Sequence, residues 1–328
     1  MADRERDAFA AACEEHRGRL RVHCYRMTGS LDDAEDLVQE TLLRAWRSRV
    51  TFEGRASLST WLHRIATNAC LDALARRPAR VLPSDVVRAV APDDEPRATP
   101  PLAPELPWMQ PFPDRLLDPE TLAASRESVE LAYLAALQHL PPRQRAILIL
   151  CDVLGWSAKE VADLLELTVA AVTSALQRAH ATMRELVPSG RAAWTPLAPP
   201  SDDERALLDR FMAAWERGDP GELTRMLRDD VKWQMPPAAL WFHGRAAVED
   251  LFRRFPMRFH GDHRMVAARA NRQLAAAGYM RRHGDTEFRF SGVLVLRVEG
   301  GQIAEITSFA AALCHGFELP MIFSPPPV

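Results

Sequence analysis

The sequence is poor in cysteine and in lysine and contains no long apolar run. Its five cysteines among 328 residues are scattered and odd in number, which argues against a disulfide framework and is typical of a reducing compartment. No stretch reaches the roughly 18 apolar residues that suggest a membrane-spanning helix. The opening residues, MADRERDAFAAACEEH, are charged and lack the apolar core of a signal peptide. These absences predict a cytoplasmic protein that does not enter a membrane.

Motifs for metals and cofactors are also missing. Cys13 and His16 share one face of a predicted helix, with His23 and Cys24 close behind, but no Cys-x-x-Cys pair supports a zinc site. We therefore interpret these four as packed or surface residues, and we expect neither a bound metal nor a cofactor.

Charge is distributed in blocks, although the net charge is only −3. Residues 31–40 carry five acids and no base, whereas residues 41–80 carry eight arginines against two acids. Residues 81–120 then carry eight acids against three arginines, together with ten of the 25 prolines. The whole chain is therefore not a basic nucleic-acid binder, but a compact basic segment lies between two acidic ones.

The chain divides into five predicted parts. Residues 8–78 and 121–187 have helical periodicity, and the Pro-rich, acidic segment 79–120 is predicted to be an extended linker with little structure of its own. A Pro-rich hinge at 188–201 precedes residues 202–320, where two helices lead into strands and EGGQ forms a hairpin turn. The predicted fold class is multidomain: two all-α domains, the second with a helix-turn-helix, followed by an α+β domain.

The segment WSAKEVADLLELTVAAVTSALQRAHATMRE has the pattern of a helix-turn-helix. Ser157 and Glu160 form a Ser-x-x-Glu capping box that starts the first helix, and after a short turn Thr168 can cap the second. The second helix has a predicted buried stripe of Val169, Val172, Leu176, Ala179 and Met183. The residues left to bind base edges and phosphates are Thr168, Ala170, Thr173, Ser174, Gln177, Arg178 and Arg184. A plain helical hairpin has the same pattern, so DNA binding is one of two interpretations.

The segment DAEDLVQETLLRAW is a predicted amphipathic helix with a mixed polar face. Its core face comprises Ala34, Leu37, Val38, Thr41, Ala45 and Trp46. The opposite face comprises Asp36, Gln39, Glu40, Leu43 and Arg47. Carboxylates repel phosphate, so acids beside an amide and an exposed leucine favour a protein partner over DNA, although a solvated helix face has a similar pattern.

The next segment, FEGRASLSTWLHRIATNACLDALARR, is basic and suits single-stranded DNA. Ser59 or Thr60 can cap its helix, and we interpret Trp61 as a structural core residue. The basic and amide side chains left for the outer surface are Arg55, His63, Arg64, Asn68, Arg76 and Arg77. Arginines can neutralise the DNA backbone, and a pocket beside the flexible EGRAS loop can hold an unstacked base.

These three segments, in this order, resemble the sigma-70 class of RNA polymerase sigma factors, in the extracytoplasmic-function group. DAEDLVQETLLRAW is similar to the region 2 helix that docks on the coiled coil of the polymerase β′ subunit. The basic segment is similar to the part of the family that melts and recognises the promoter −10 element. LPPRQRAILILCDVLGWSAKEVADLLELTVAAVTSALQRAHATMRE is similar to region 4, which recognises the −35 element and contacts the β flap. The linker is similar in place to the family segment that threads toward the RNA exit channel.

The sequence departs from the family pattern at two places. The helix-turn-helix turn holds Glu166 where many relatives have glycine, so its geometry is in question. Thr173 and Ala175 stand where many relatives carry basic residues. The −35 contacts are therefore expected to depend more on Gln177, Arg178 and Arg184.

Residues 202–320 resemble a SnoaL-like, nuclear-transport-factor-like cone, which some sigma factors of this group carry as an extra C-terminal domain. Residues that suit the lining of an apolar ligand pocket, or the core of the cone, are Trp233, Met235, Trp241, Phe288 and Phe290. Polar residues with catalytic potential, such as His263, Asn271 and Tyr279, form no motif, so we do not expect an enzyme.

The resemblance implies a promoter-specificity subunit whose partners are core RNA polymerase and promoter DNA, and whose cone regulates it in cis. A small ligand in the cone stays an open question. The alternative is a ligand-responsive helix-turn-helix regulator that binds duplex DNA without polymerase. Such a regulator does not need an acidic docking helix joined to a basic, Trp-bearing segment, so the sequence favours the sigma factor.

Overall fold

The computed structural model describes residues 2–52, 54, 56–91, 94, 102–117, 130–187, 200–254, 257 and 261–323, with side chains from residue 6 onward. These residues form two compact units. The first comprises Met1–Arg80 with Arg115–Pro196, and the second comprises Val81–Asp114 with Leu197–Val328. Within the described ranges, no helix is both long and apolar enough to cross a bilayer. Most of the predicted linker thus belongs to the same unit as the C-terminal domain.

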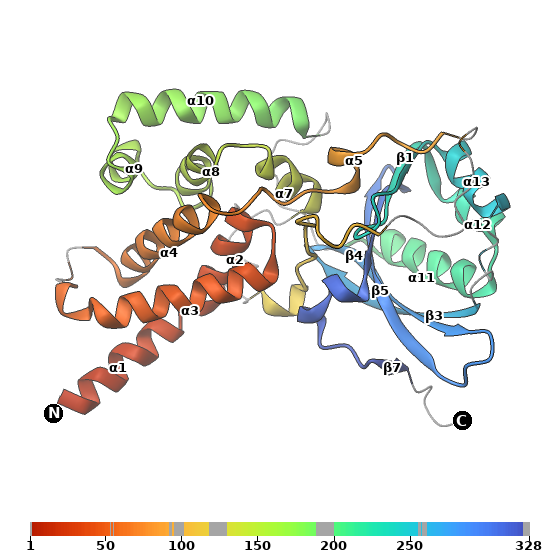
Figure 1. Ribbon diagram of the computed structural model, residues 1–328, viewed down its shortest axis with the longest axis horizontal. Coiled ribbons are helices and arrows are strands. Elements are labelled where there is room, and N and C mark those ends of the chain that lie inside the picture. Colours follow the sequence, from red (N-terminus) through yellow and green to blue (C-terminus); the bar gives the residue numbers. More distant parts are fainter. Residues whose placement is uncertain are drawn as a thin grey trace. The chain divides into compact units, whose positions relative to one another are not determined.

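The N-terminal part of the first unit is helical (Figure 1). Its elements are α1 (Ala2–Glu14), α2 (Arg17–Thr28), α3 (Leu31–Arg47), the 3-10 turn η1 (Arg49–Thr51) and α4 (Leu58–Leu74). Ser30 caps α3 by accepting a hydrogen bond from the N–H of Asp33. The cap of α4 was predicted at Ser59 or Thr60, and that prediction is wrong. Ser57 accepts the N–H of Thr60 at 3.1 Å, so the helix begins earlier.

The rest of the first unit contains the helix-turn-helix. Its elements are α7 (Leu131–Gln138), α8 (Pro142–Leu148) with the π turn η3 (Ile149–Val153), α9 (Ala158–Leu165) and α10 (Val169–Leu186). The predicted capping box is present, because Ser157 and Glu160 bond each other's backbone N–H groups, and Thr168 caps α10. Glu166 adopts the left-handed conformation with φ 55°, so the turn keeps the geometry that glycine usually supplies.

A buried arginine joins the two helical groups of the first unit. Arg145 of α8 is 1% exposed and donates to the carbonyl of Met27 at the end of α2. It also donates to the side-chain oxygen of Gln138 at 2.5 Å and to the carbonyls of Gln138 and Leu140. Gln138 in turn donates to the carbonyl of Arg26. Burial lowers the pKa of the Arg145 guanidinium to about 10. The carbonyls that end α2 are therefore satisfied by side chains of the second helical group.

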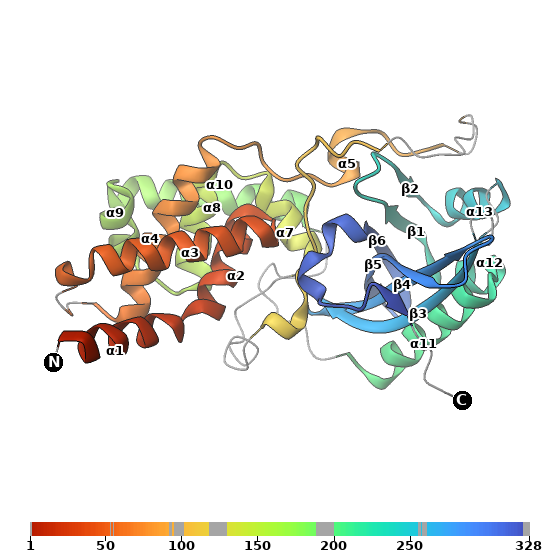
Figure 2. The ribbon, with the colours of Figure 1, turned by 60° about the horizontal axis from the view of Figure 1, so that its bottom comes forward.

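The second unit is a mixed sheet covered by helices (Figure 2). Its helices are α5 (Pro83–Val86), α11 (Asp202–Arg217), α12 (Pro220–Arg225) and α13 (Arg245–Arg254), with short 3-10 turns at Ala311–Leu313 and His315–Phe317. A further 3-10 turn, Asp114–Leu116, lies in the chain where the second unit gives way to the first. Its strands are β1 (Leu227–Gln234), β2 (Trp241–His243), β3 (Gly261–Ala270), β4 (Gln273–Arg282), β5 (Phe288–Glu299), β6 (Gln302–Ala310) and β7 (Ile322–Phe323). The order is β2-β1-β6-β5-β4-β3, with β7 paired to β5, and β1 with β6 is the parallel pair.

One apolar core fills the space between the sheet and helices α11, α12 and α13. Phe211 from α11, Trp233 from β1 and Phe252 from α13 meet in it, with the Trp233 and Phe252 rings 5.6 Å apart. The predicted EGGQ turn joins β5 to β6, and Gly300 and Gly301 both have positive φ, as a type I′ turn requires. The sequence-based prediction of an α+β domain here is confirmed.

The described residues of the linker within 81–114 dock on the rest of the second unit. The N–H of Val90 donates to the carbonyl of Trp241 at 2.9 Å, and the N–H of Ala103 donates to the carbonyl of Pro237 at 3.0 Å. Phe112 and Asn271 are bonded reciprocally: the N–H of Phe112 donates to Asn271 Oδ1, and the N–H of Asn271 donates to the Phe112 carbonyl. The linker has little regular secondary structure, as its composition predicts, but its described residues are held in place.

Candidate functional sites

The outer face of α3 is exposed as the sequence predicts. Ala34, Leu37, Val38, Thr41 and Ala45 are buried on the other side of the helix. The residues that face outward are Asp36, Gln39, Leu43 and Arg47, together with the half-buried Glu40, which accepts a hydrogen bond from Arg44. Trp46 was assigned to the core face, and that assignment is wrong, because its side chain is 37% exposed.

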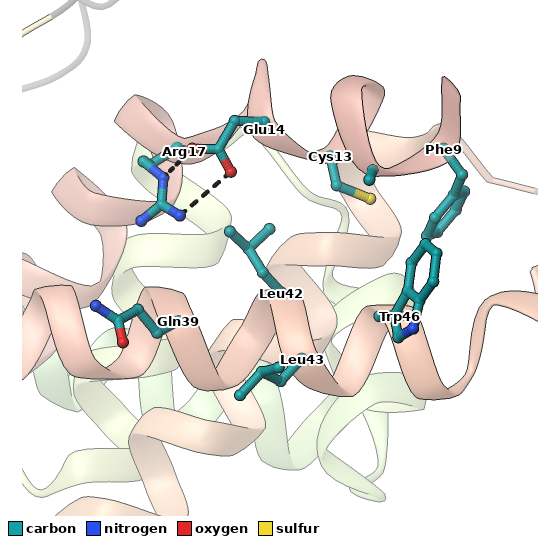
Figure 3. Close-up of a pocket in the computed structure, with 9 residues that line it drawn as sticks. Phe9, Cys13, Glu14, Arg17, Gln39, Leu42, Leu43 and Trp46 are labelled. Carbon is teal, nitrogen blue, oxygen red and sulfur yellow. Dashed lines mark hydrogen bonds and ion pairs between the residues drawn. The ribbon is translucent and has the colours of Figure 1, made fainter. Parts of the chain in front are cut away.

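Trp46 is exposed because it lines a groove between α1 and α3 of about 390 Å³ (Figure 3). At one end, Phe9 and Trp46 lie with their ring centroids 6.5 Å apart, and at the other end Arg17 is paired with Glu14. The other lining residues are Ala10, Cys13, Gln39, Leu42 and Leu43. Gln39 and Leu43 thus belong both to the groove and to the outer face of α3. The α1 wall of the groove was not predicted, although the spacing of four between Phe9 and Cys13 indicates one helix face.

The basic segment is only partly available to DNA. Asn68, Arg76 and Arg77 are exposed and Arg64 is half-buried, although Arg77 is already paired with Asp33 at the start of α3. Arg55 lies outside the described residues.

His63 is 4% exposed and packs against His23, with the ring centroids 5.3 Å apart. Its predicted role on the outer surface is therefore incompatible with its position in this structure. Trp61 contacts the rings of Phe9 and Phe52, in line with the structural role assigned to it.

The outer surface of α10 carries every residue that the sequence analysis placed there. Thr168, Ala170, Thr173, Ser174, Gln177, Arg178 and Arg184 are all exposed. The buried side is Val172, Ala175, Ala179 and Met183, with Leu176 half-buried. Val169 was assigned to that buried stripe, and the assignment is wrong, because Val169 is 48% exposed. As the first residue of α10 it projects past the core formed with α9.

The five predicted lining residues of the cone lie in three separate places. Trp233 is buried in the core, where its indole donates to Ser308, and Met235 packs against the same core. Trp241 lies beside the docked linker, and its indole donates to the carbonyl of Val87. Phe288 and Phe290 lie on β5, next to Phe323 and Tyr279 respectively. These positions do not form one pocket.

The three polar residues named above as having catalytic potential are engaged in structural contacts. Asn271 holds the linker, His263 packs edge-on against Trp215, and the Tyr279 ring packs against Phe290. Across the described ranges, no three His, Cys, Asp or Glu side chains are placed to hold a metal ion.

Family models match each part of the chain in turn. Sigma-70 region 2 matches residues 13–80, Sigma-70 region 4 matches residues 130–183, and a SnoaL-like domain matches residues 208–306. The first match contains α3 and α4, and the second contains the helix-turn-helix.

Two sigma factors of one species align with long stretches of this chain. The ECF RNA polymerase sigma factor SigG of Mycobacterium tuberculosis is 45% identical over 312 residues, which are 94% of this chain and 82% of the relative. SigJ of the same species is 30% identical over 221 residues, 65% of this chain and 61% of the relative. The crystal structure of SigJ has a TM-score of 0.60 at 22% identity and covers 92% of this chain and 95% of its own, which shows a shared fold. The chain belongs to the extracytoplasmic-function group of RNA polymerase sigma factors, the subunits that bind core polymerase and promoter DNA to start transcription.

Proposed function

We propose that core polymerase binds the outer face of α3 together with the α1–α3 groove. An exposed leucine beside an apolar groove, with charged groups at its margin, is a typical protein-binding surface. Leu43 is 51% exposed there, and Gln39 connects the helix face to the groove. The resemblance of α3 to the helix that docks on the β′ coiled coil supports the same assignment.

Binding of labelled full-length chain to core polymerase tests this docking surface. Leu43→Glu introduces a charge where an apolar contact is expected, so we expect the Kd to rise at least about tenfold. Met321→Glu is the matched control, because Met321 is 66% exposed but lies in the second unit. Equal Kd values for the two variants would place the docking surface elsewhere.

We propose that Arg64, Asn68 and Arg76 face the −10 element and that the outer surface of α10 faces the −35 element. Arg76 is exposed at the end of α4, and Arg178 and Arg184 are exposed on α10. Arginines there suit phosphate contacts, which fix register and make affinity depend on salt. Replacing Arg76 with alanine should lower the salt slope of promoter binding by about one, without changing sequence preference.

We propose that the C-terminal domain regulates transcription by holding the linker. The single observation that supports this most is the reciprocal bonding of Phe112 with Asn271. Fully extended, the roughly 40 residues of the linker could span about 140 Å, whereas elements 25 base pairs apart are separated by about 85 Å of B-form DNA. When the described residues within 81–114 are docked, much less chain is free to adjust this distance. Docking would then restrict the promoter spacings that the sigma factor accepts.

Transcription in vitro from promoters with different −35 to −10 spacers tests this regulation. Asn271→Gly removes the side-chain acceptor but keeps the left-handed conformation that Asn271 adopts at φ 56°. Glu318→Gly is the matched control, because Glu318 is exposed and adopts the left-handed conformation at φ 51° in the same unit. We expect the Asn271→Gly variant to transcribe from a wider range of spacers and the Glu318→Gly variant to match the wild type. Identical spacer ranges for all three proteins would refute control through the linker.

A further inference from the structure

The exposed face at the start of α10 is apolar. Val169 is 48% exposed, and Ala170 and Thr173 are exposed beside it. Positions 169 and 173 are one helical turn apart, as are 170 and 173, so the three side chains form one small surface. Single exposed valines are common, but this one lies on the helix of a sigma region 4 match that faces DNA in a helix-turn-helix.

The threonine in this surface presents its methyl group. Thr173 Oγ1 donates to the carbonyl of Val169 at 3.0 Å, so the hydroxyl is turned back toward the helix. Thr168, just before the helix, uses its hydroxyl oxygen to accept the N–H of Ala171 at 3.1 Å. The outward groups of the surface are therefore the methyl groups of Val169, Ala170 and Thr173.

A methyl surface at this place selects among the four bases. The N-terminal residues of the second helix of a helix-turn-helix contact base edges in the major groove. In that groove thymine alone carries a methyl group, and apolar side chains contact it, whereas guanine, adenine and cytosine are recognised by hydrogen bonds. Val169 and Ala170 have no side-chain donor or acceptor, and Thr173 has used its hydroxyl on the backbone.

We propose that Val169, Ala170 and Thr173 recognise the 5-methyl group of thymine in the −35 element. This inference rests on the proposed contact between α10 and −35 DNA. Arg178, further along the exposed side of α10, is placed for a phosphate, while Ser174 and Gln177 supply the neighbouring hydrogen bonds. The promoters of this sigma factor therefore contain, in the −35 element, at least one A·T pair that is recognised through the methyl group of its thymine.

The first experiment selects −35 sequences from a randomised library with full-length chain and core polymerase. We expect the wild-type selection to contain a thymine, on either strand, whose preference is lost with Val169→Ala while other positions stay unchanged. Selection of no −35 sequence at all would refute the proposed function, and this inference with it. A selected motif that Val169→Ala leaves unaltered would refute only the methyl contact.

The second experiment removes the methyl group from the DNA and not from the protein. Deoxyuridine replaces thymidine at the selected position, which keeps base pairing and changes only the 5-methyl group. Burial of one methyl group corresponds to about a three- to fivefold change in affinity, so we expect the holoenzyme to bind the uracil promoter that much more weakly. Equal affinity for the two promoters would overturn the proposal.

Two substitutions at one position separate the methyl group from the hydroxyl. Thr173→Ser keeps the hydroxyl and its bond to Val169 but loses the methyl, whereas Thr173→Val keeps the methyl and loses the hydroxyl. We expect the serine variant to discriminate less between thymine and uracil and the valine variant to retain the wild-type ratio. The opposite order would show that the hydroxyl makes the contact, and the proposal would fail.

Discussion

Acid should destabilise the first unit through a buried histidine pair between α2 and α4. His63 is 4% exposed and His23 is 1% exposed. His63 Nδ1 donates to the carbonyl of Ser59 at 2.8 Å, and Thr67 donates its hydroxyl proton to the carbonyl of His63. That leaves the Thr67 oxygen to accept from His23 Nε2 at 3.0 Å. His23 Nδ1 has no hydrogen-bond partner among the described residues, so the His23 ring is placed for the neutral form.

Burial is the main reason why both histidines resist protonation. Burial, together with the positive charges of His16, Arg19 and Arg26, lowers the pKa of His63 to about 4, although the bond to the Ser59 carbonyl acts in the opposite direction. Burial, with the charges of His63 and Arg26, also holds the pKa of His23 well below its usual value. The unfolded chain binds protons near pH 6.5, so stability is lost as the pH falls below 6.5. At pH 4.5, His63 alone should remove about 2.5 kcal/mol of the free energy of unfolding relative to pH 7.5, and His23 should add to this loss.

Hydrogen exchange of the α4 backbone at the two pH values isolates this effect from the second unit. The opening free energy of α4, corrected for intrinsic exchange rates, falls on acidification in the wild type. We expect this fall to be about 2.5 kcal/mol smaller in His63→Gln. His283→Gln, at an exposed position in the second unit, should behave as the wild type. If His63→Gln shows the same acid-induced drop as the wild type, His63 is not held neutral and the reasoning is refuted.

Three further substitutions test other parts of the structure. Arg145→Met leaves four carbonyl or amide oxygens without their donor, so it should destabilise the first unit by about 3 kcal/mol or more. Hydrogen exchange should become faster in α2 and α7 and stay unchanged in β5. Glu166→Gly relieves a left-handed residue and should raise the unfolding free energy by about 1 kcal/mol; a lower melting temperature would contradict this. Gly292→Ala places a Cβ 2.0 Å from the Phe309 carbonyl oxygen, so it should destabilise the second unit by about 3 kcal/mol or more in urea unfolding. If the variant is as stable as the wild type, the strand shifts at little cost.

The sequence was sufficient to predict the buried face of a helix where neighbouring parts of the chain cover that face. The apolar faces of α3 and α10 and the capping box of α9 follow from spacings of three and four residues, because neighbouring helices in the same small unit cover those faces. Even Glu166, which departs from the family pattern, does not alter the turn, since the contacts of α9 with α10 impose the left-handed conformation on it.

Two predictions were wrong because an apolar stripe in the sequence continues beyond the residues that a neighbouring helix buries. Val169 and Trp46 both fit an apolar stripe, but they lie at the first turn of α10 and the last turn of α3. At these ends the stripe is covered only in part, because Val169 lies outside the core shared by α9 and α10 and Trp46 lines the α1–α3 groove. His63 failed in the opposite sense: a polar residue was assigned outward, although a second histidine 40 residues earlier in the sequence provides it with a buried partner. Neither outcome can be derived from local spacing.

The docking of the linker leaves almost no trace in the sequence, and this is a consequence of how it is held. Its bonds to the second unit are largely made by backbone groups, and the partners Phe112 and Asn271 are 159 residues apart. A Pro-rich, acidic composition predicts an extended segment whether the segment is free or docked. The segment also buries Leu82, Trp108, Met109 and Phe112, so its release would expose apolar surface and cost free energy. A segment attached in this way suits a firm restraint on the distance between regions 2 and 4, which is the proposed role that the spacer experiment measures.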